Sequence, residues 1–216
     1  MSATISLLRE TTLVTDVQVR AAARALQTQI SRDFAPFWLH DATVVVGKKA
    51  GAWPIHLMDH SDVANSLGYH WTANGAADGS PIAFVGIGDD IHFHLDWHVT
   101  LSHEALEMLA NPTCGAVFPY PGGMSCAAEV GDPVESDRLA YPIYGLKQSN
   151  FVTPAYFTGR GTRYDFRRVL TAPLTLAPGG YISILENGTW RQEFAQAVDG
   201  DVSRMTMSHR AARIGH

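Results

Sequence analysis

The chain has 216 residues, of which 46% are hydrophobic and 17% charged, and its formal net charge is -5 at pH 7. Because a domain typically has roughly 150 residues, this length favours one domain over two. The apolar fraction is that of a globular protein that buries a sizeable core. The acidic balance gives no general attraction for nucleic acid, and the sequence has neither a signal-peptide pattern nor the roughly 20 apolar residues that span a bilayer. The sequence therefore predicts a soluble, cytoplasmic protein without nucleic-acid or membrane partners.

The first elements in chain order are a helix and three strands. The helix is expected from Thr15 to about Phe34, because apolar residues recur there every three or four positions. Thr15 and Gln18 have the form of a capping box at its start, and Pro36 lies just beyond its end. Three β-like runs bounded by Gly, Pro and Asp follow: Ala42 to Val46, Trp53 to Met58, and Pro81 to Gly86. Residues 66–79 are rich in Gly, Asn and Ala and are expected to form a loop.

A second helix is expected from about Trp97 to Ala110, because Asn111-Pro112 is a strong stop signal. Residues 112–125 are dense in Gly and Pro and are expected to be largely irregular. The final third alternates short β-like or coil runs with turns at 178–180 and 187–188. The order of elements predicts one α+β domain over residues 1–216. It would have a small mixed sheet, an N-terminal backing helix, the second helix beneath, and an irregular C-terminal half.

The last segment, from about residue 200, is expected to be a solvated, flexible tail. A local basic patch is the alternative there, formed by Arg204, Arg210 and Arg213.

The second helix carries the pattern with the clearest chemistry, His103-Glu104-x-x-Glu107. Residues four apart share one helix face, so His103 and Glu107 can bind the same ion. Glu104 points about 100° further round the helix, where it can act on a water molecule beside that ion. This is the geometry of a zinc peptidase motif, with a carboxylate in place of the usual second histidine. The sequence predicts a metal site, most simply for zinc, with Glu104 as general base.

A third ligand is expected in the acidic segment from Glu129 to Asp137. Glu129 follows Glu107 by 22 positions and Asp132 follows it by 25, a distance that suits a loop returning to the metal. We favour Glu129 as the ligand, with Asp132 as either the ligand itself or the acceptor for the second nitrogen of His103. A solvated acidic turn is the alternative for both residues.

Three further side chains could assist the site. His98 could orient it or bind an oxyanion, although an ordinary histidine at a helix start is equally compatible with the sequence. Tyr144, or Tyr141, could donate a hydrogen bond to a transition-state oxyanion.

The sequence contains two other groups of potential metal ligands. His92 and His94 alternate as residues on one strand face do, and a second metal site built from them is a minor alternative. Cys114 and Cys126 lie in a Gly/Pro-rich stretch and are expected to be unpaired thiols, with a single disulfide as the alternative.

Several segments, in order over roughly residues 15 to 190, resemble a family of bacterial and phage-associated zincin-like proteins with an HExxE motif. They are QISRDFAPFW (29–38), LGYHW (67–71), SHEALEMLANP (102–112), AEVGDPVESD (128–137), SNFVTPAYF (149–157) and LAPGGYISI (176–184). The resemblance implies a zincin fold and a metallopeptidase-like site, with His103, Glu104 and Glu107 matching the helix motif. Glu129 and Asp132 match its downstream acidic motif. Gly131 departs from the cysteine expected between Val130 and Asp132.

Two functions remain open. In the first, the protein is a zinc-dependent peptidase, and the run from Pro81 to Gly86 is the sheet edge on which an extended peptide substrate pairs. In the second, it is a non-catalytic zincin-fold structural or assembly protein that binds protein partners in a phage or phage-like particle, and is then virion-associated. A closed, four-ligand metal site would favour the second function. A carboxylate-bridged di-iron protein is excluded, because it needs a four-helix bundle with paired Glu-x-x-His motifs.

Overall fold

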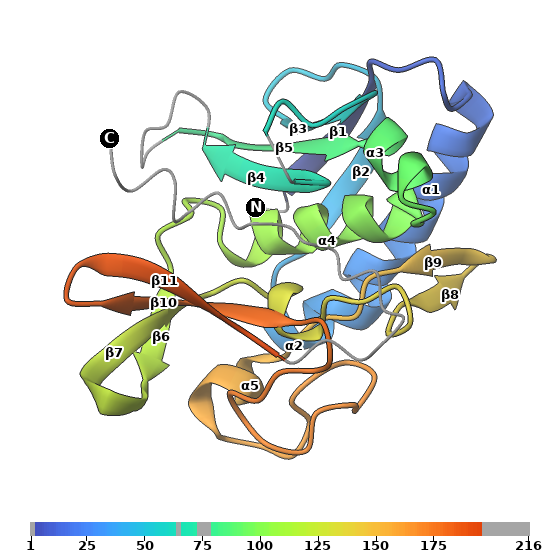
Figure 1. Ribbon diagram of the computed structural model, residues 1–216. Helices are drawn as coiled ribbons and strands as arrows, with labels where there is room; N and C mark the ends of the chain where they lie inside the picture. Colours follow the sequence, from blue (N-terminus) through green and yellow to red (C-terminus); the bar gives the residue numbers. More distant parts are fainter. Residues whose placement is uncertain (1–2, 64–65, 73–78, 196–216) are drawn as a thin grey trace.

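The computed structural model describes residues 3–63, 66–72 and 79–195, and its N-terminal half is built on a five-stranded sheet (Figure 1). The strand order is β2-β1-β3-β5-β4. The strands are β1 (Ala3–Arg9), β2 (Ala42–Val46), β3 (Trp53–Met58), β4 (Gly68–Thr72) and β5 (Pro81–Gly86). All neighbouring pairs are parallel except β4 and β5, which are antiparallel, so the sheet is mixed as expected.

The sequence predicted β2, β3 and β5 with the observed bounds but missed the other two strands. β1 lies between β2 and β3, and its side chains Ile5 and Leu7 are fully buried. β4 lies inside the segment that was predicted to be a loop. Because β4 takes the edge, β5 is an interior strand, and its expected role as the sheet edge was wrong.

The N-terminal helical segment is longer than the sequence suggested. α1 (Asp16–Thr28) begins with the predicted capping box, in which Gln18 N–H donates to the Thr15 hydroxyl. The chain continues through a π-helical turn (Gln29–Phe34) into α2 (Ala35–Trp38). Pro36 therefore lies inside the helical segment and not beyond its end. It occupies the first turn of α2, where the missing proline N–H costs little.

α4 (Trp97–Ala110) follows the short helix α3 (Ile87–His92) and has the predicted bounds. The Asp96 side chain caps it by accepting from His98 N–H, and every α4 residue except His98 is buried. α4 runs beneath the five-stranded sheet and contacts β4 and β5 (Figure 1). At Gly68 the approach is so close that a Cβ would lie 2.7 Å from the Thr100 methyl carbon and 2.9 Å from the Phe84 carbonyl oxygen.

The C-terminal half is far more regular than predicted. A four-stranded sheet has the order β11-β10-β7-β6, and β8 pairs with β9. Asn187 and Gly188, at φ 50° and 82°, form the predicted turn between β10 and β11. The remaining elements are β6 (Val117–Tyr120), 3-10 helix η3 (Pro121–Gly123), β7 (Met124–Ala127), 3-10 helix η4 (Asp132–Val134), β8 (Tyr141–Ile143), β9 (Leu146–Gln148), α5 (Pro154–Thr158), β10 (Tyr181–Glu186) and β11 (Thr189–Phe194).

One large hydrophobic cluster joins the two halves, since it contains Leu7 of β1, Leu106 of α4 and Ile184 of β10. The chain is thus an α+β structure in which α4 lies between the N-terminal sheet and the C-terminal elements (Figure 1). No helix in the described part of the chain is long and apolar enough to cross a bilayer. The tail expected from about residue 200, with its three arginines, lies outside the described residues.

Candidate metal centre

The side chains of His103 and Glu107 meet on one face of α4, as their spacing predicted. His103 Nε2 lies 3.4 Å from Glu107 Oε2, and both side chains are almost completely buried. The four-residue spacing produces this pairing, because side chains at i and i+4 are neighbours on a helix surface.

The segment between β7 and η4 returns the chain to α4 and brings Asp132 to the same place. Asp132 Oδ1 lies 3.3 Å from His103 Nε2. The backbone N–H of Gly131 donates to Glu107 Oε1 at 3.0 Å, which fixes this segment on the helix. Ligand atoms of His103, Glu107 and Asp132 all lie within 4.8 Å of one another. Between the two carboxylates that the sequence offered as third ligand, the structure places Asp132 in this triad.

β4 contributes a residue that the sequence analysis did not assign to the site, His70. Its Nδ1 lies 3.4 Å from Glu104 Oε2 and 3.5 Å from Glu107 Oε2. Its Nε2 lies 3.5 Å from Glu129 Oε2, so Glu129 faces His70. His70, Glu104 and Glu107 form a second triad of ligand atoms within 4.8 Å of one another, and Glu107 belongs to both triads. The run Tyr69 to Thr72, with three β-favouring residues around the histidine, was the available signal for this strand.

Burial dominates the electrostatics of the cluster. It raises the pKa of Glu104 well above its usual range and that of Asp132 to about 7, because water no longer solvates the charged carboxylates. Burial opposes the charged form of His103 too. The negative charge of Glu107 and a hydrogen bond to Asp132 nevertheless raise the pKa of its imidazole well above the ordinary value. No lysine or arginine is buried anywhere in the described ranges, so protons or a bound cation must balance these carboxylates.

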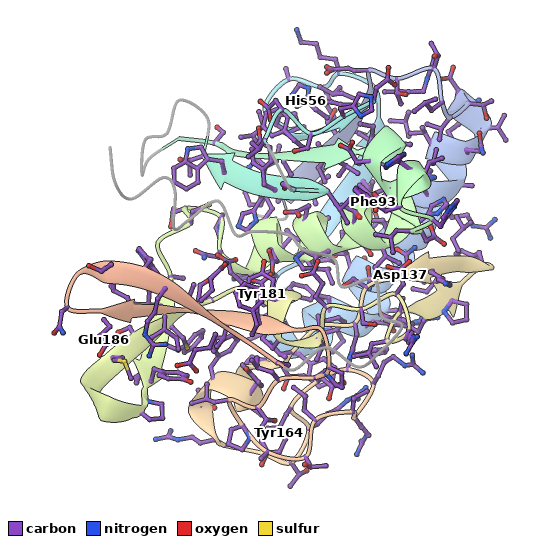
Figure 2. The ribbon with its side chains drawn as sticks, in the orientation of Figure 1. His56, Phe93, Asp137, Tyr164, Tyr181 and Glu186 are labelled. Carbon is purple, nitrogen blue, oxygen red and sulfur yellow. The ribbon has the colours of Figure 1, made fainter. Side chains whose placement is uncertain are left out.

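The C-terminal sheet supports Asp132 through Tyr181, the first residue of β10. Tyr181 lies between α4 and this sheet (Figure 2), and its hydroxyl hydrogen-bonds the Asp132 side chain. The preceding Gly180 permits the contact, because a Cβ at that position would lie 2.4 Å from the Pro133 carbonyl oxygen. A buried hydrogen-bond partner of this kind orients a potential metal-binding carboxylate.

His98 and Tyr144, which the sequence suggested could assist the metal site, contact residues outside the cluster. His98 stacks on Trp97 and pairs through Nδ1 with Asp96 Oδ1 at 2.5 Å, at the start of α4. Tyr144 is 60% exposed and packs on α1, where its hydroxyl accepts from Thr28 and Arg24 lies over its ring. The structure therefore does not bring Tyr144 to the cluster.

The remaining candidates also lie apart from it. Tyr141 donates to Asp33 Oδ2 at 3.0 Å and accepts from Gln29, a buried structural arrangement. His92 and His94 are exposed at the end of α3 and just after it, so they do not share a strand face. Cys114 and Cys126 are not joined by a disulfide, as expected.

The interatomic distances suit a metal ion. Tetrahedral ligands at about 2.1 Å from zinc lie about 3.4 Å from each other. The measured separations of 3.3 Å and 3.4 Å around His103 Nε2 match that value. They are longer than the usual N–H···O hydrogen-bond length of roughly 2.9 Å, so the hydrogen bonds of His103 to these carboxylates are long ones. One imidazole and two carboxylates in a buried position are also a ligand set that zinc accepts.

Comparison with known proteins assigns neither a family nor a function to the chain. No protein-family model, curated protein or solved structure matches the chain.

Proposed function

We propose that the protein is a metal-dependent hydrolase of peptide bonds, with a zinc ion held by His103, Glu107 and Asp132. The observation that carries the proposal is that buried ligand atoms of these three side chains lie within 4.8 Å of one another, with His103 Nε2 3.4 Å from Glu107 Oε2 and 3.3 Å from Asp132 Oδ1. A zinc ion in such a position lowers the pKa of a bound water and polarises a carbonyl group. Three protein ligands leave the fourth position that catalysis needs.

Glu104 is the general base of the proposed reaction. It follows His103 on α4 and is buried with it, and burial raises the pKa of its carboxyl group well above the usual range. A carboxylate with a raised pKa takes a proton from water more readily than one with an ordinary pKa. It can then return that proton to the leaving amine.

The substrate class follows from β4. Among the described strands, β4 is the last in the order of the five-stranded sheet, and it lies directly on α4 beside the cluster. An extended peptide can add to such an edge through main-chain hydrogen bonds. An edge strand next to a buried base and a metal site favours an extended polypeptide over a compact small molecule as substrate.

The direct test is hydrolysis of an unstructured protein and of a mixed peptide library by the zinc-loaded protein. We expect cleavage that a chelator stops and that zinc restores. A Glu107→Gln preparation, purified identically, measures contaminating peptidases. Equal cleavage by the Glu107→Gln preparation, or none by wild-type protein that holds one equivalent of zinc, would contradict the proposal.

One observation favours a second candidate, a closed structural metal site in an assembly protein. The side chains of His103, Glu107 and Asp132 are only 3–6% exposed, and a metal that only stabilises the fold needs no access. Tightly bound zinc with no hydrolysis of either substrate would support this candidate.

A further inference from the structure

The second triad, His70 with Glu104 and Glu107, is not used by the proposed hydrolysis as a ligand set. From its geometry we infer that the protein has a second, inhibitory divalent-cation site, which shares Glu107 with the first site and takes Glu104 as a ligand. The inference rests on the proposed function for its inhibitory effect. The second site itself is a separate claim about cation binding.

The geometry of the second triad resembles that of the first. His70 Nδ1 lies 3.4 Å from Glu104 Oε2 and 3.5 Å from Glu107 Oε2, again close to the separation of about 3.4 Å between tetrahedral zinc ligands. The Glu107 atom is Oε2 in both triads, since it also lies 3.4 Å from His103 Nε2. This oxygen can therefore bridge two ions, the arrangement of two-metal sites whose ions are about 3.5–4 Å apart.

The charge of the cluster also favours a second cation. Five carboxylates are buried in it, and no buried lysine or arginine occurs among the residues placed by the structure. They are Glu104, Glu107, Glu129, Asp132 and Glu135, and the charge of Glu135 acts on the Glu104 carboxyl group. If all five carboxylates are ionised, one divalent cation neutralises two of their five negative charges and two cations neutralise four.

A cation bound at the second site prevents Glu104 from acting as the general base. A Glu104 carboxylate that ligates a cation cannot accept a proton from water, because its lone pairs are engaged and the positive charge lowers its basicity. Hydrolysis should therefore rise as the first equivalent of zinc binds and fall as the second binds. A divalent cation thus acts at low concentration as cofactor and at higher concentration as inhibitor.

The test counts zinc ions by calorimetric titration, followed by elemental analysis after gel filtration. We expect two equivalents for wild-type protein and one for His70→Asn, whose affinity for the second ion should fall at least about 100-fold. Glu104→Gln should also bind one equivalent, which keeps the inference testable if His70→Asn fails to fold. His56→Asn is the matched control. His56 lies on β3, which β5 separates from β4, and its imidazole faces Glu10 outside the cluster, so this variant should bind two equivalents of zinc.

The outcomes separate the two claims. One equivalent in wild-type protein, or two in both His70→Asn and Glu104→Gln, would overturn the second site and leave the proposed function intact. No zinc at all in wild-type protein would overturn both. If wild-type protein binds two equivalents of zinc and the second equivalent leaves the rate of hydrolysis unchanged, the inhibitory role would be overturned.

Discussion

Gly131 lies against the imidazole of His103 so closely that a Cβ at residue 131 would be 2.4 Å from His103 Nδ1 and 2.6 Å from Cε1. The same residue donates its backbone N–H to Glu107 Oε1. The absence of a side chain at Gly131 therefore lets the acidic segment pack on α4 with both His103 and Glu107 in place.

Gly131→Ala should displace the His103 ring. We expect zinc affinity to fall about 10- to 100-fold, and the unfolding free energy of the metal-free protein to fall by about 1–3 kcal/mol from overpacking. Zinc titration and chemical denaturation measure these effects. Gly115→Ala is the control, because a Cβ there meets nothing closer than the Thr113 hydroxyl at 3.6 Å. Equal behaviour of the two variants would show that the contact does not position His103.

Glu104→Gln should lower the rate of peptide hydrolysis at least about 100-fold, because an amide cannot accept the proton of the attacking water. The ion in the triad of His103, Glu107 and Asp132 should remain. Initial rates and zinc content, measured on one preparation with a single equivalent of zinc, check both statements. Undiminished turnover would refute the role of Glu104 as base.

Asp132→Asn and Glu129→Gln distinguish the two carboxylates offered as third ligand. Asp132 faces His103, whereas Glu129 faces His70. We expect Asp132→Asn to weaken binding of the first zinc ion at least about 100-fold and Glu129→Gln to weaken it less than about tenfold. Competition with a chromophoric chelator gives both affinities, and the reverse order would assign Glu129 as the ligand.

The metal-free protein should lose stability as pH rises. Burial raises the pKa of Asp132 from 3.8 to about 7, so between these values the folded state keeps a proton that the unfolded chain has released. This stabilising contribution is complete below pH 3.8 and is lost as pH rises through about 7. The raised pKa values of Glu104 and His103 act in the same direction.

Melting temperatures in chelator across this pH range should therefore fall more steeply for wild-type protein than for Asp132→Asn, which has no proton to release. Parallel curves for the two proteins would contradict the raised pKa of Asp132. Zinc should flatten the wild-type curve, because the ion replaces the protons.

The sequence predicted the parts of the fold whose local signals were unambiguous. α4 could be bounded because Asn111-Pro112 stops a helical pattern, and β2, β3 and β5 are apolar runs between turn residues. β1 was missed because its place depends on pairing with the distant strands β2 and β3, and β4 because its neighbourhood is rich in Gly and Asn. The sheets of the C-terminal half depend on pairings such as β7 with β10, between residues about 60 positions apart, which local pattern does not reveal.

The residues of the candidate site also fall into those that the sequence predicted and those that only the structure revealed. His103, Glu104 and Glu107 follow from helical spacing, and the acidic segment was found from its distance along the chain. The choice of Asp132 for the first triad needed the packing of Gly131 and Gly180. His70 could be placed only once β4 was known to lie on α4.

The central claim is that His103, Glu107 and Asp132 hold a divalent cation. Anomalous diffraction at the zinc edge, from crystals of zinc-loaded protein, tests it most directly. We expect a peak at bonding distance from His103 Nε2, Glu107 Oε2 and Asp132 Oδ1. Crystals without a peak there, or with zinc only on exposed histidines such as His92 and His94, would contradict it.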